Sequence, residues 1–374
     1  MIDCYIGAAT GAFKAVNFKE AKVTNLNRIS GLVPKNDEIV AICWGDEEQT
    51  EVVSVQADRK IKITNVNRIS GLVPKNDEIV AMCWGDEEQT EVVSVQADRK
   101  IKVYNELTEL YSDLFDAECV EGEGPIKAIR WIKENGNIVT AAGSGHLAVW
   151  NNQGKRLSPD NWTAGADLLA MDRNPELLQI ATGGKANLLK TWDLERHENV
   201  WSAKNVPVDW LYVPVPIWDT NVKYLNQHEM VTTTGKGQIR VYDPRKDQRP
   251  VQDFVYMDCP ITALSLCYKE RFIVVGNTTG NVSVYDLRNT KNQIVKLRSF
   301  AGSVRSIDAH PKTPFMVSVG LDRHIRLHHI GKKKLIKKIY AKVHLNSVLF
   351  KKINSCEKVK PDDMRWEKEE DWKD

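Results

Sequence analysis

The chain has 374 residues, of which 42% are hydrophobic and 27% are charged, and its formal net charge is +2. This composition is typical of a globular protein and excludes a polyelectrolyte. No apolar stretch approaches the roughly 18 residues of a transmembrane helix, and the N-terminus lacks the features of a secretory signal. The seven cysteines form no Cys-x-x-Cys pair, which argues against a disulfide framework and a zinc ribbon.

Short β-strands in repeated units account for most of the chain. Each unit has an apolar strand, a second strand that ends at a turn rich in Gly, Asn or Asp, and an alternating third strand such as Ile239–Tyr242. The third strands close, in chain order, on the pairs Val16-Asn17, Thr64-Asn65, Tyr104-Asn105, Trp150-Asn151, Trp192-Asp193, Tyr242-Asp243, Tyr285-Asp286 and His328-His329. Successive pairs lie 40 to 50 residues apart, a period that is typical of β-propeller blades.

Two neighbouring units have almost the same sequence. Residues 24–63 and 64–103 differ at three positions only, which are Leu26/Val66, Ile42/Met82 and Ile63/Val103. All three differences exchange apolar residues of similar size, which protein cores tolerate well. The sequence therefore predicts an all-β propeller with seven blades, or with eight if the duplicated unit 64–103 is a real blade.

The two ends of the propeller are predicted to meet. The chain opens in the middle of a unit, with a second strand at 4–7 and a third strand at 12–16, and the missing first strand is available at 345–350. Pairing of these segments would remove the exposed sheet edges. We therefore expect a closed propeller over residues 1–353 and a charged, disordered tail over residues 354–374.

Charge is distributed unevenly near the C-terminus. Residues 323–360 contain twelve Lys or Arg and one acid, whereas residues 361–374 contain seven acids and three bases. The basic segment includes an expected outer strand that presents Lys332, Lys333, Lys334, Lys337 and Lys338. These lysines fit a surface for RNA phosphates or another anion, or an import signal. They fit equally well the protection of an outer strand against edge-to-edge pairing.

Several stretches are more specific than the strand pattern. They are 181–194, 203–206, 209–211, 216–219, 238–244, 301–305, 310–311 and 320–323, and the first contains a literal Trp-Asp pair. Through them the chain resembles the nucleolar WD-repeat ribosome-assembly factors that act on the precursor of the large ribosomal subunit. The resemblance covers about residues 4–353 and is strongest over about 180–330.

This resemblance implies a seven-bladed WD-repeat propeller that assembles pre-ribosomes and supports pre-rRNA processing without catalytic activity. It implies a location in the nucleus and nucleolus. It also implies that the partners are other ribosome-assembly proteins, and that an AAA-type ATPase is linked to release. The duplicated unit departs from the family pattern, as does the ending at Trp372-Lys373-Asp374 where family members usually continue into a longer basic tail.

No motif in the sequence points to catalysis. P-loop, His-Glu-x-x-His and Gly-x-Ser-x-Gly motifs are absent, so we predict no catalytic residue and no cofactor. His324, His328 and His329 cluster without a nearby cysteine or carboxylate, so we predict no metal site. The alternatives to an assembly scaffold are a generic WD-repeat adaptor, such as a ubiquitin-ligase substrate receptor, and a propeller enzyme. We expect neither membrane association nor a small-molecule substrate.

Function in a propeller is carried by its loops. The Pro-rich segment 206–216 is predicted to form an extended loop across one end of the ring, because prolines do not fit a central strand. The predicted partner-binding residues around this loop are Lys204, Asn205, Asp209, Trp210 and Trp218, although both tryptophans would also fit between blades. A second set of predicted partner-binding residues consists of four bases, namely Lys185, Arg240, Arg305 and Arg323. If all four lie at the same end of the propeller they form an anion-binding ring, and otherwise they are solvated or ion-paired side chains. Direct rRNA contact is expected to be accessory to these protein contacts.

Overall fold

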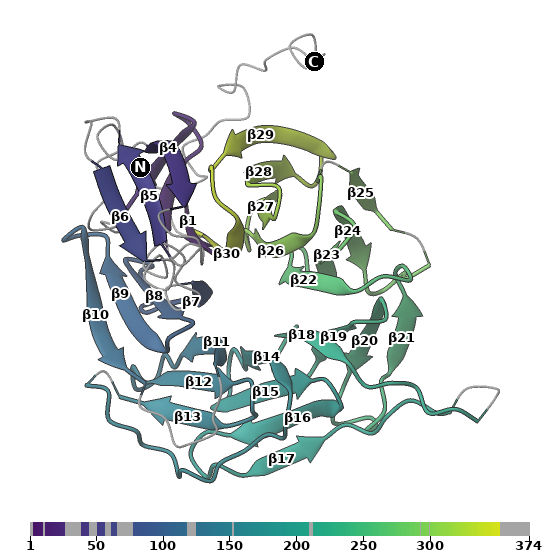
Figure 1. Cartoon of the computed structure of the whole chain (residues 1–374). Coiled ribbons are helices and arrows are strands. Elements are labelled where there is room, and N and C mark those ends of the chain that lie inside the picture. The colour runs from purple at the N-terminus through teal and green to yellow at the C-terminus, as the bar shows by residue number, and fades with distance from the viewer. Residues whose placement is uncertain are drawn as a thin grey trace.

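The computed structural model describes residues 3–9, 12–26, 78–117, 125–151, 153–208, 212–291, 293–298 and 300–351, and the backbone of three strands within 39–65. Within these ranges the regular structure consists of β-strands, and no helix occurs. Seven antiparallel sheets surround a central opening like the blades of a propeller (Figure 1). The all-β, seven-bladed prediction is therefore confirmed.

Each blade begins with an inner strand beside the central opening. We number the blades 1 to 7 by their inner strands, which are β30 (Leu345–Phe350), β7 (Ile79–Trp84), β11 (Ile126–Trp131), β14 (Leu168–Arg173), β18 (Asp219–Tyr224), β22 (Ile261–Leu266) and β26 (Val304–Ala309). These strands lie side by side in this order, and β26 lies beside β30. The ring is thus closed.

The other strands of each blade follow outward. The second strands are β1 (Cys4–Ala8), β8 (Glu91–Gln96), β12 (Ile138–Ala142), β15 (Gln179–Gly184), β19 (Met230–Thr234), β23 (Phe272–Asn277) and β27 (Phe315–Gly320). The third strands are β2 (Phe13–Asn17), β9 (Lys100–Asn105), β13 (Leu147–Trp150), β16 (Asn187–Asp193), β20 (Gln238–Tyr242), β24 (Asn281–Asp286) and β28 (His324–His329). The outer strands are β3 (Lys22–Asn25), β10 (Leu110–Asp116), β17 (Asn199–Ser202), β21 (Gln252–Val255), β25 (Val295–Arg298) and β29 (Lys334–Tyr340).

Aromatic residues at the ends of the third strands hold the blades together. Trp192 Nε1 donates a hydrogen bond of 2.9 Å to Thr182 Oγ1 on the neighbouring second strand. Trp150 Nε1 donates one of 2.8 Å to Thr140 Oγ1 in the same way. Both indoles are buried in the cores between blades, so the repeated closing residue has a packing role.

Apart from Thr24 and Asn25 at the end of β3, the first of the two duplicated units takes no part in the ring. Its strands β4 (Ile39–Trp44), β5 (Glu51–Gln56) and β6 (Ile61–Asn65) form a separate three-stranded sheet and pair only with one another in the described part of the chain (Figure 1). Strand β7 lies directly beside β30 and β1, so blade 2 follows blade 1 without an intervening blade. Unit 64–103 therefore supplies blade 2 and is not an eighth blade.

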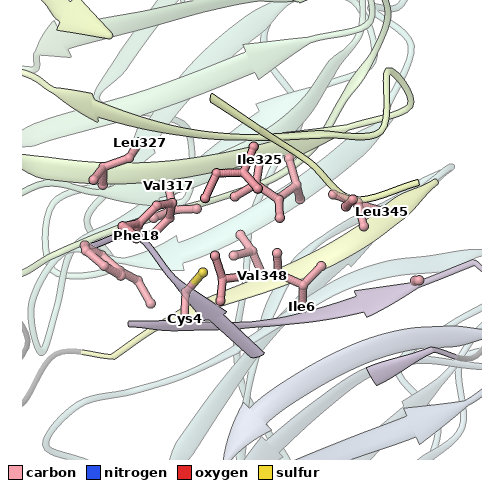
Figure 2. Packing of buried hydrophobic residues seen from close by; sticks show 14 of the residues in the cluster. Cys4, Ile6, Phe18, Val317, Ile325, Leu327, Leu345 and Val348 are labelled. Carbon is pink, nitrogen blue, oxygen red and sulfur yellow. The ribbon is translucent and has the colours of Figure 1, made fainter. Parts of the chain in front are cut away.

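The two ends of the chain meet in blade 1. Strand β30 pairs with β1 in antiparallel register, with Cys4 opposite Phe350 and Ile6 opposite Val348. Figure 2 shows the apolar core between this blade and blade 7, with Cys4, Ile6, Phe18, Val317, Ile325, Leu327, Leu345 and Val348 packed together. A boundary of the propeller at residue 353 stays a prediction, because residues from 352 onward lie outside the described part.

Close packing between blades 1 and 2 requires a glycine. A Cβ atom on Gly7 would lie 2.6 Å from Ile79 Cγ2 and 2.7 Å from Ser347 Oγ. Contacts this short are repulsive, so a larger residue at position 7 would force the side chain of Ile79 or Ser347 to move.

The strand order gives the ring two distinct faces. We call the face where the inner strands begin the start face and the face where they end the end face. On the start face of all seven blades, the residue after the second strand donates its N–H to the carbonyl of the residue before the inner strand. These bonds of 2.8–3.1 Å are Ala9→His344, Ala97→Glu78, Gly143→Pro125, Lys185→Asp167, Gly235→Trp218, Thr278→Pro260 and Leu321→Ser303. Side chains in the turns after the second strands therefore gather on the start face.

Candidate functional site

Three of the predicted basic residues lie exposed on the start face. Arg323 is in the turn between β27 and β28, and Arg305 is the second residue of β26. The Leu321 N–H···O=C Ser303 bond joins their two segments in blade 7. Lys185 is in the turn between β15 and β16 of blade 4, where it bridges to Trp218. The structure thus brings Arg305 and Arg323 together, with Lys185 on the same face three blades away.

Arg240 does not reach this surface. Its side chain is 1% exposed, its Nη2 donates a hydrogen bond of 2.7 Å to Gln238 Oε1, and its Nε lies 3.5 Å from Asp253 Oδ2. Arg240 therefore acts as an interior ion-pairing residue of blade 5, and a start-face ring cannot include it.

A buried carboxylate near Arg240 has no counterpart in the sequence-based prediction. Asp219, the first residue of β18, is 1% exposed, and neither of its carboxylate oxygens accepts a hydrogen bond from a described residue. Burial raises the pKa of Asp219 to about 7, although the Arg240 guanidinium acts to lower it. Nothing in the surrounding sequence distinguishes this aspartate from those that follow the closing aromatic residues.

A long loop connects blades 4 and 5, and we call its described residues, 203–208 and 212–218, the rim loop. Figure 1 shows it projecting outward from the ring beside β21, whereas the sequence predicted a loop across one end. Two contacts hold its base. Lys204 N–H donates to Gln248 O at 2.8 Å, and Asn205 Nδ2 donates to Val215 O at 2.8 Å. Asn205 therefore ties the two arms of the loop together.

The rim loop presents apolar side chains and one base to the outside. Val208 is 49% exposed, Tyr212 is 86% exposed and Val213 is 53% exposed, and Lys204 is also exposed. Exposed apolar groups on a projecting loop are typical of a protein-binding surface. The sequence-based prediction missed the exposure of Tyr212 and Val213, although aromatic and prolyl content pointed to this segment.

Of the three remaining predicted residues of this loop, the structure describes only Trp218. Trp218 is half-buried, and a Cβ on Gly235 would lie 2.2 Å from its Cδ2 atom, so the indole packs against the backbone of the neighbouring turn. This contact fixes the point where the loop returns to the ring. Asp209 and Trp210 lie outside the described residues.

A second basic surface lies on the end face where blades 7 and 1 meet. We define the basic patch as six exposed lysines from two turns and the outer strands β3 and β29, namely Lys19, Lys22, Lys332, Lys333, Lys334 and Lys338. Lys337 Nζ donates to Phe18 O at 2.6 Å, which joins β29 to the turn between β2 and β3. Lys337 is therefore a structural link, and the patch gains Lys19 and Lys22 only because ring closure brings distant segments together.

The three histidines of the predicted cluster differ in their burial and contacts. His328 is 1% exposed, and burial together with the Arg326 guanidinium lowers its pKa to about 4. His324 Nδ1 lies 2.7 Å from Asp322 O. Among the described residues, no three His, Cys, Asp or Glu side chains are grouped so that they could hold a metal ion. In the same part of the chain, no helix has the length and apolarity to cross a bilayer.

The closed ring, its repeated blade pattern and its exposed loops define a WD-repeat β-propeller. A solved structure of this fold, entitled "Structure of U3-55K", has a TM-score of 0.60 at 15% identity and covers 72% of this chain and 84% of that one. The family described as "Nucleolar protein 10-like, N-terminal domain" matches residues 219–355.

Curated relatives identify the family more closely. WD repeat-containing protein 74 of Homo sapiens is 37% identical over 356 residues, which are 92% of this chain and 80% of that protein. The Bos taurus protein of the same name is 36% identical over 353 residues, with the same coverage. The chain therefore belongs to the WD repeat-containing protein 74 family. It is also 25% identical over 205 residues to "Ribosome biogenesis protein NSA1" of Meyerozyma guilliermondii, across 46% of this chain and 52% of that protein.

Proposed function

We propose that this chain is a non-catalytic scaffold for assembly of the large ribosomal subunit in the nucleus and nucleolus. The observation that carries the proposal is sequence similarity over most of the ring to WD repeat-containing protein 74, together with similarity to proteins named for ribosome biogenesis. A propeller with two exposed, chemically different surfaces suits this role, because it can hold several molecules at once.

Assembly proteins bind the start face and the rim loop in this proposal. Tyr212 and Val213 supply apolar anchors, and Lys204, Lys185, Arg305 and Arg323 favour an acidic partner surface. Because Asn205 and the loop prolines restrict the rim loop, less conformational entropy is lost on binding.

The basic patch contacts rRNA phosphates in this proposal. Lys332, Lys333 and Lys334 follow one another, and Lys337 ties the strand that Lys334 begins to the turn that carries Lys19, so a polyanion can contact several of these lysines at once. Such contacts give affinity that falls with salt and does not depend on base sequence. Release from the particle by an AAA-type ATPase, which the family resemblance implies, would have to break both kinds of contact.

Co-purification tests the protein-binding surface. Lys204→Glu combined with Tyr212→Ala should leave the ring folded and reduce recovery of the tagged chain in pre-ribosomal particles at least several-fold. Lys291→Glu, at an exposed lysine in blade 6, is the charge-matched control. Full association of the rim-loop variant would refute this assignment, and absence of the wild-type chain from such particles would refute the proposed function.

RNA crosslinking in cells tests the basic patch. Simultaneous change of Lys332, Lys333 and Lys334 to Glu should remove most ultraviolet crosslinks to rRNA. The control changes three other exposed lysines to Glu, namely Lys155, Lys291 and Lys296. Equal loss in both variants would show a general charge effect and would contradict a specific role of the patch.

A further inference from the structure

The C-terminal strand leaves the ring next to the basic patch. Lys351, which follows β30, donates its N–H to Asp3 O at 3.0 Å, and Asp3 Oδ2 accepts a hydrogen bond of 2.6 Å from Phe18 N–H. Phe18 directly precedes Lys19 of the patch, and its carbonyl accepts the Lys337 bond. The exit point and the patch therefore share one hydrogen-bonded network on the end face.

The net charge of the sequence that follows Lys351 changes from positive to negative along the chain. Residues 352–360 contain three lysines and one glutamate, and residues 361–374 contain seven acids against three bases. Nine residues can span about 30 Å when extended. The acidic segment 361–374 can therefore reach the patch on the face from which the chain emerges.

We propose that the acidic segment 361–374 binds the basic patch of its own chain and competes there with RNA phosphates. The short connection gives the segment an effective concentration on the order of millimolar at the patch, so weak exposed ion pairs suffice for partial occupancy. The same weakness lets a polyanion with more charges displace it. The competition part of this inference rests on the proposed rRNA contact, whereas the contact within the chain does not.

Zero-length carbodiimide crosslinking of the purified full chain tests the contact directly. Peptides joining acids of 361–374 to patch lysines should form at about 50 mM salt and decline at about 500 mM, because screening weakens exposed pairs. The Lys351–Glu106 pair, with Nζ and Oε2 2.5 Å apart, is the internal control. If only the control crosslink forms, or if mixed isotope-labelled chains give crosslinks mainly between molecules, the proposal is wrong.

Binding to polyuridylate tests the competition. A variant with the seven acids of 361–374 changed to Asn or Gln should bind at least threefold more tightly than the wild type, and the difference should disappear when Lys332, Lys333 and Lys334 are Glu. Equal affinity of the neutralised variant and the wild type would overturn the competition. If no variant binds polyuridylate, the proposed RNA contact fails, and the crosslinks still decide the contact within the chain.

Discussion

Residues 24–63 and 64–103 share all but three positions, yet they occupy different places in the molecule. The second copy supplies β7, β8 and most of β9 of blade 2. The first supplies the last two residues of β3 in blade 1, and its strands β4, β5 and most of β6 pair among themselves. The repeated residues therefore determine that three strands form. They do not determine whether those strands enter the ring.

The residues that follow each copy account for the difference. The second copy continues into Tyr104 and the outer strand β10, whereas the first continues into Thr64 and the start of the second copy. Tyr104 is 1% exposed, and its ring centroid lies 5.7 Å from that of Tyr5 and 5.5 Å from that of Phe13. Tyr111 of β10 stacks on the same Phe13 ring at 5.2 Å. These aromatic contacts select the second copy for the single place between blades 1 and 3.

The largest expected effect comes from replacing Tyr104, whose aromatic contacts place the second copy in the ring. Tyr104→Ala should lower the free energy of unfolding by about 3–5 kcal/mol, because it leaves a cavity between blades 1 and 2. Thr64→Ala, at the equivalent position after the first copy, should change it by less than about 0.5 kcal/mol. Urea unfolding followed by tryptophan fluorescence measures both. Equal destabilisation by the two variants would mean that the first copy also occupies the ring.

A matched pair within the repeated sequence sharpens the comparison. Ile79 is fully buried against blade 1, so Ile79→Ala should cost about 3 kcal/mol, whereas Ile39→Ala in the first copy should cost less than about 1 kcal/mol. The two substitutions are chemically the same, so their difference in unfolding midpoint reports only the place of each copy. A larger cost for Ile39→Ala would reverse the assignment of the copies.

The blade pattern could be predicted from the sequence because each third strand carries a closing residue that its own blade requires. Arg240 shows where this reasoning fails. Alternation correctly separates it from Ile239 and Val241, but in a propeller neighbouring blades cover both faces of a sheet, so the polar face is buried as well. The two-residue period of a strand predicts which side chains share a face of the sheet. It does not predict whether solvent or another blade covers that face.

The basic patch and the rim loop were predictable only in part, because contacts between segments that are distant in the sequence determine them. Lys332–Lys334 stand out as a run in the sequence, whereas Lys19 joins them through ring closure, more than 300 residues away. The direction of the rim loop depends on the contacts of Lys204 and Asn205 with the backbone of Gln248 and Val215, and no local pattern encodes them. The two nearly identical units likewise differ too little in themselves to decide which of them enters the ring, and the residues that follow them make the difference.

A charge contact next to the second copy should have a smaller effect. Lys351 Nζ pairs with Glu106 Oε2, and the two side chains are 15% and 24% exposed. The position that corresponds to Glu106 after the first copy is Val66, which cannot form such a pair. Glu106→Gln should lower stability by about 1 kcal/mol at low salt and by less at high salt. Glu109→Gln, exposed on the same turn, is the control, and the same loss in both variants would exclude a specific role for the pair.

Deletion of the whole first copy should have the smallest effect. Removal of residues 24–63 joins Val23 to Thr64-Asn65, which restores the Thr-Asn pair at the end of β3 and changes only Leu26 into Val66 beyond it. All strands of the seven blades remain, so the melting temperature and the β-sheet circular dichroism should stay close to those of the full chain. Because β7 already contacts β30 and β1, the deletion opens no gap in the ring. A large drop in melting temperature would show that β4–β6 support the propeller and that the two copies are not redundant.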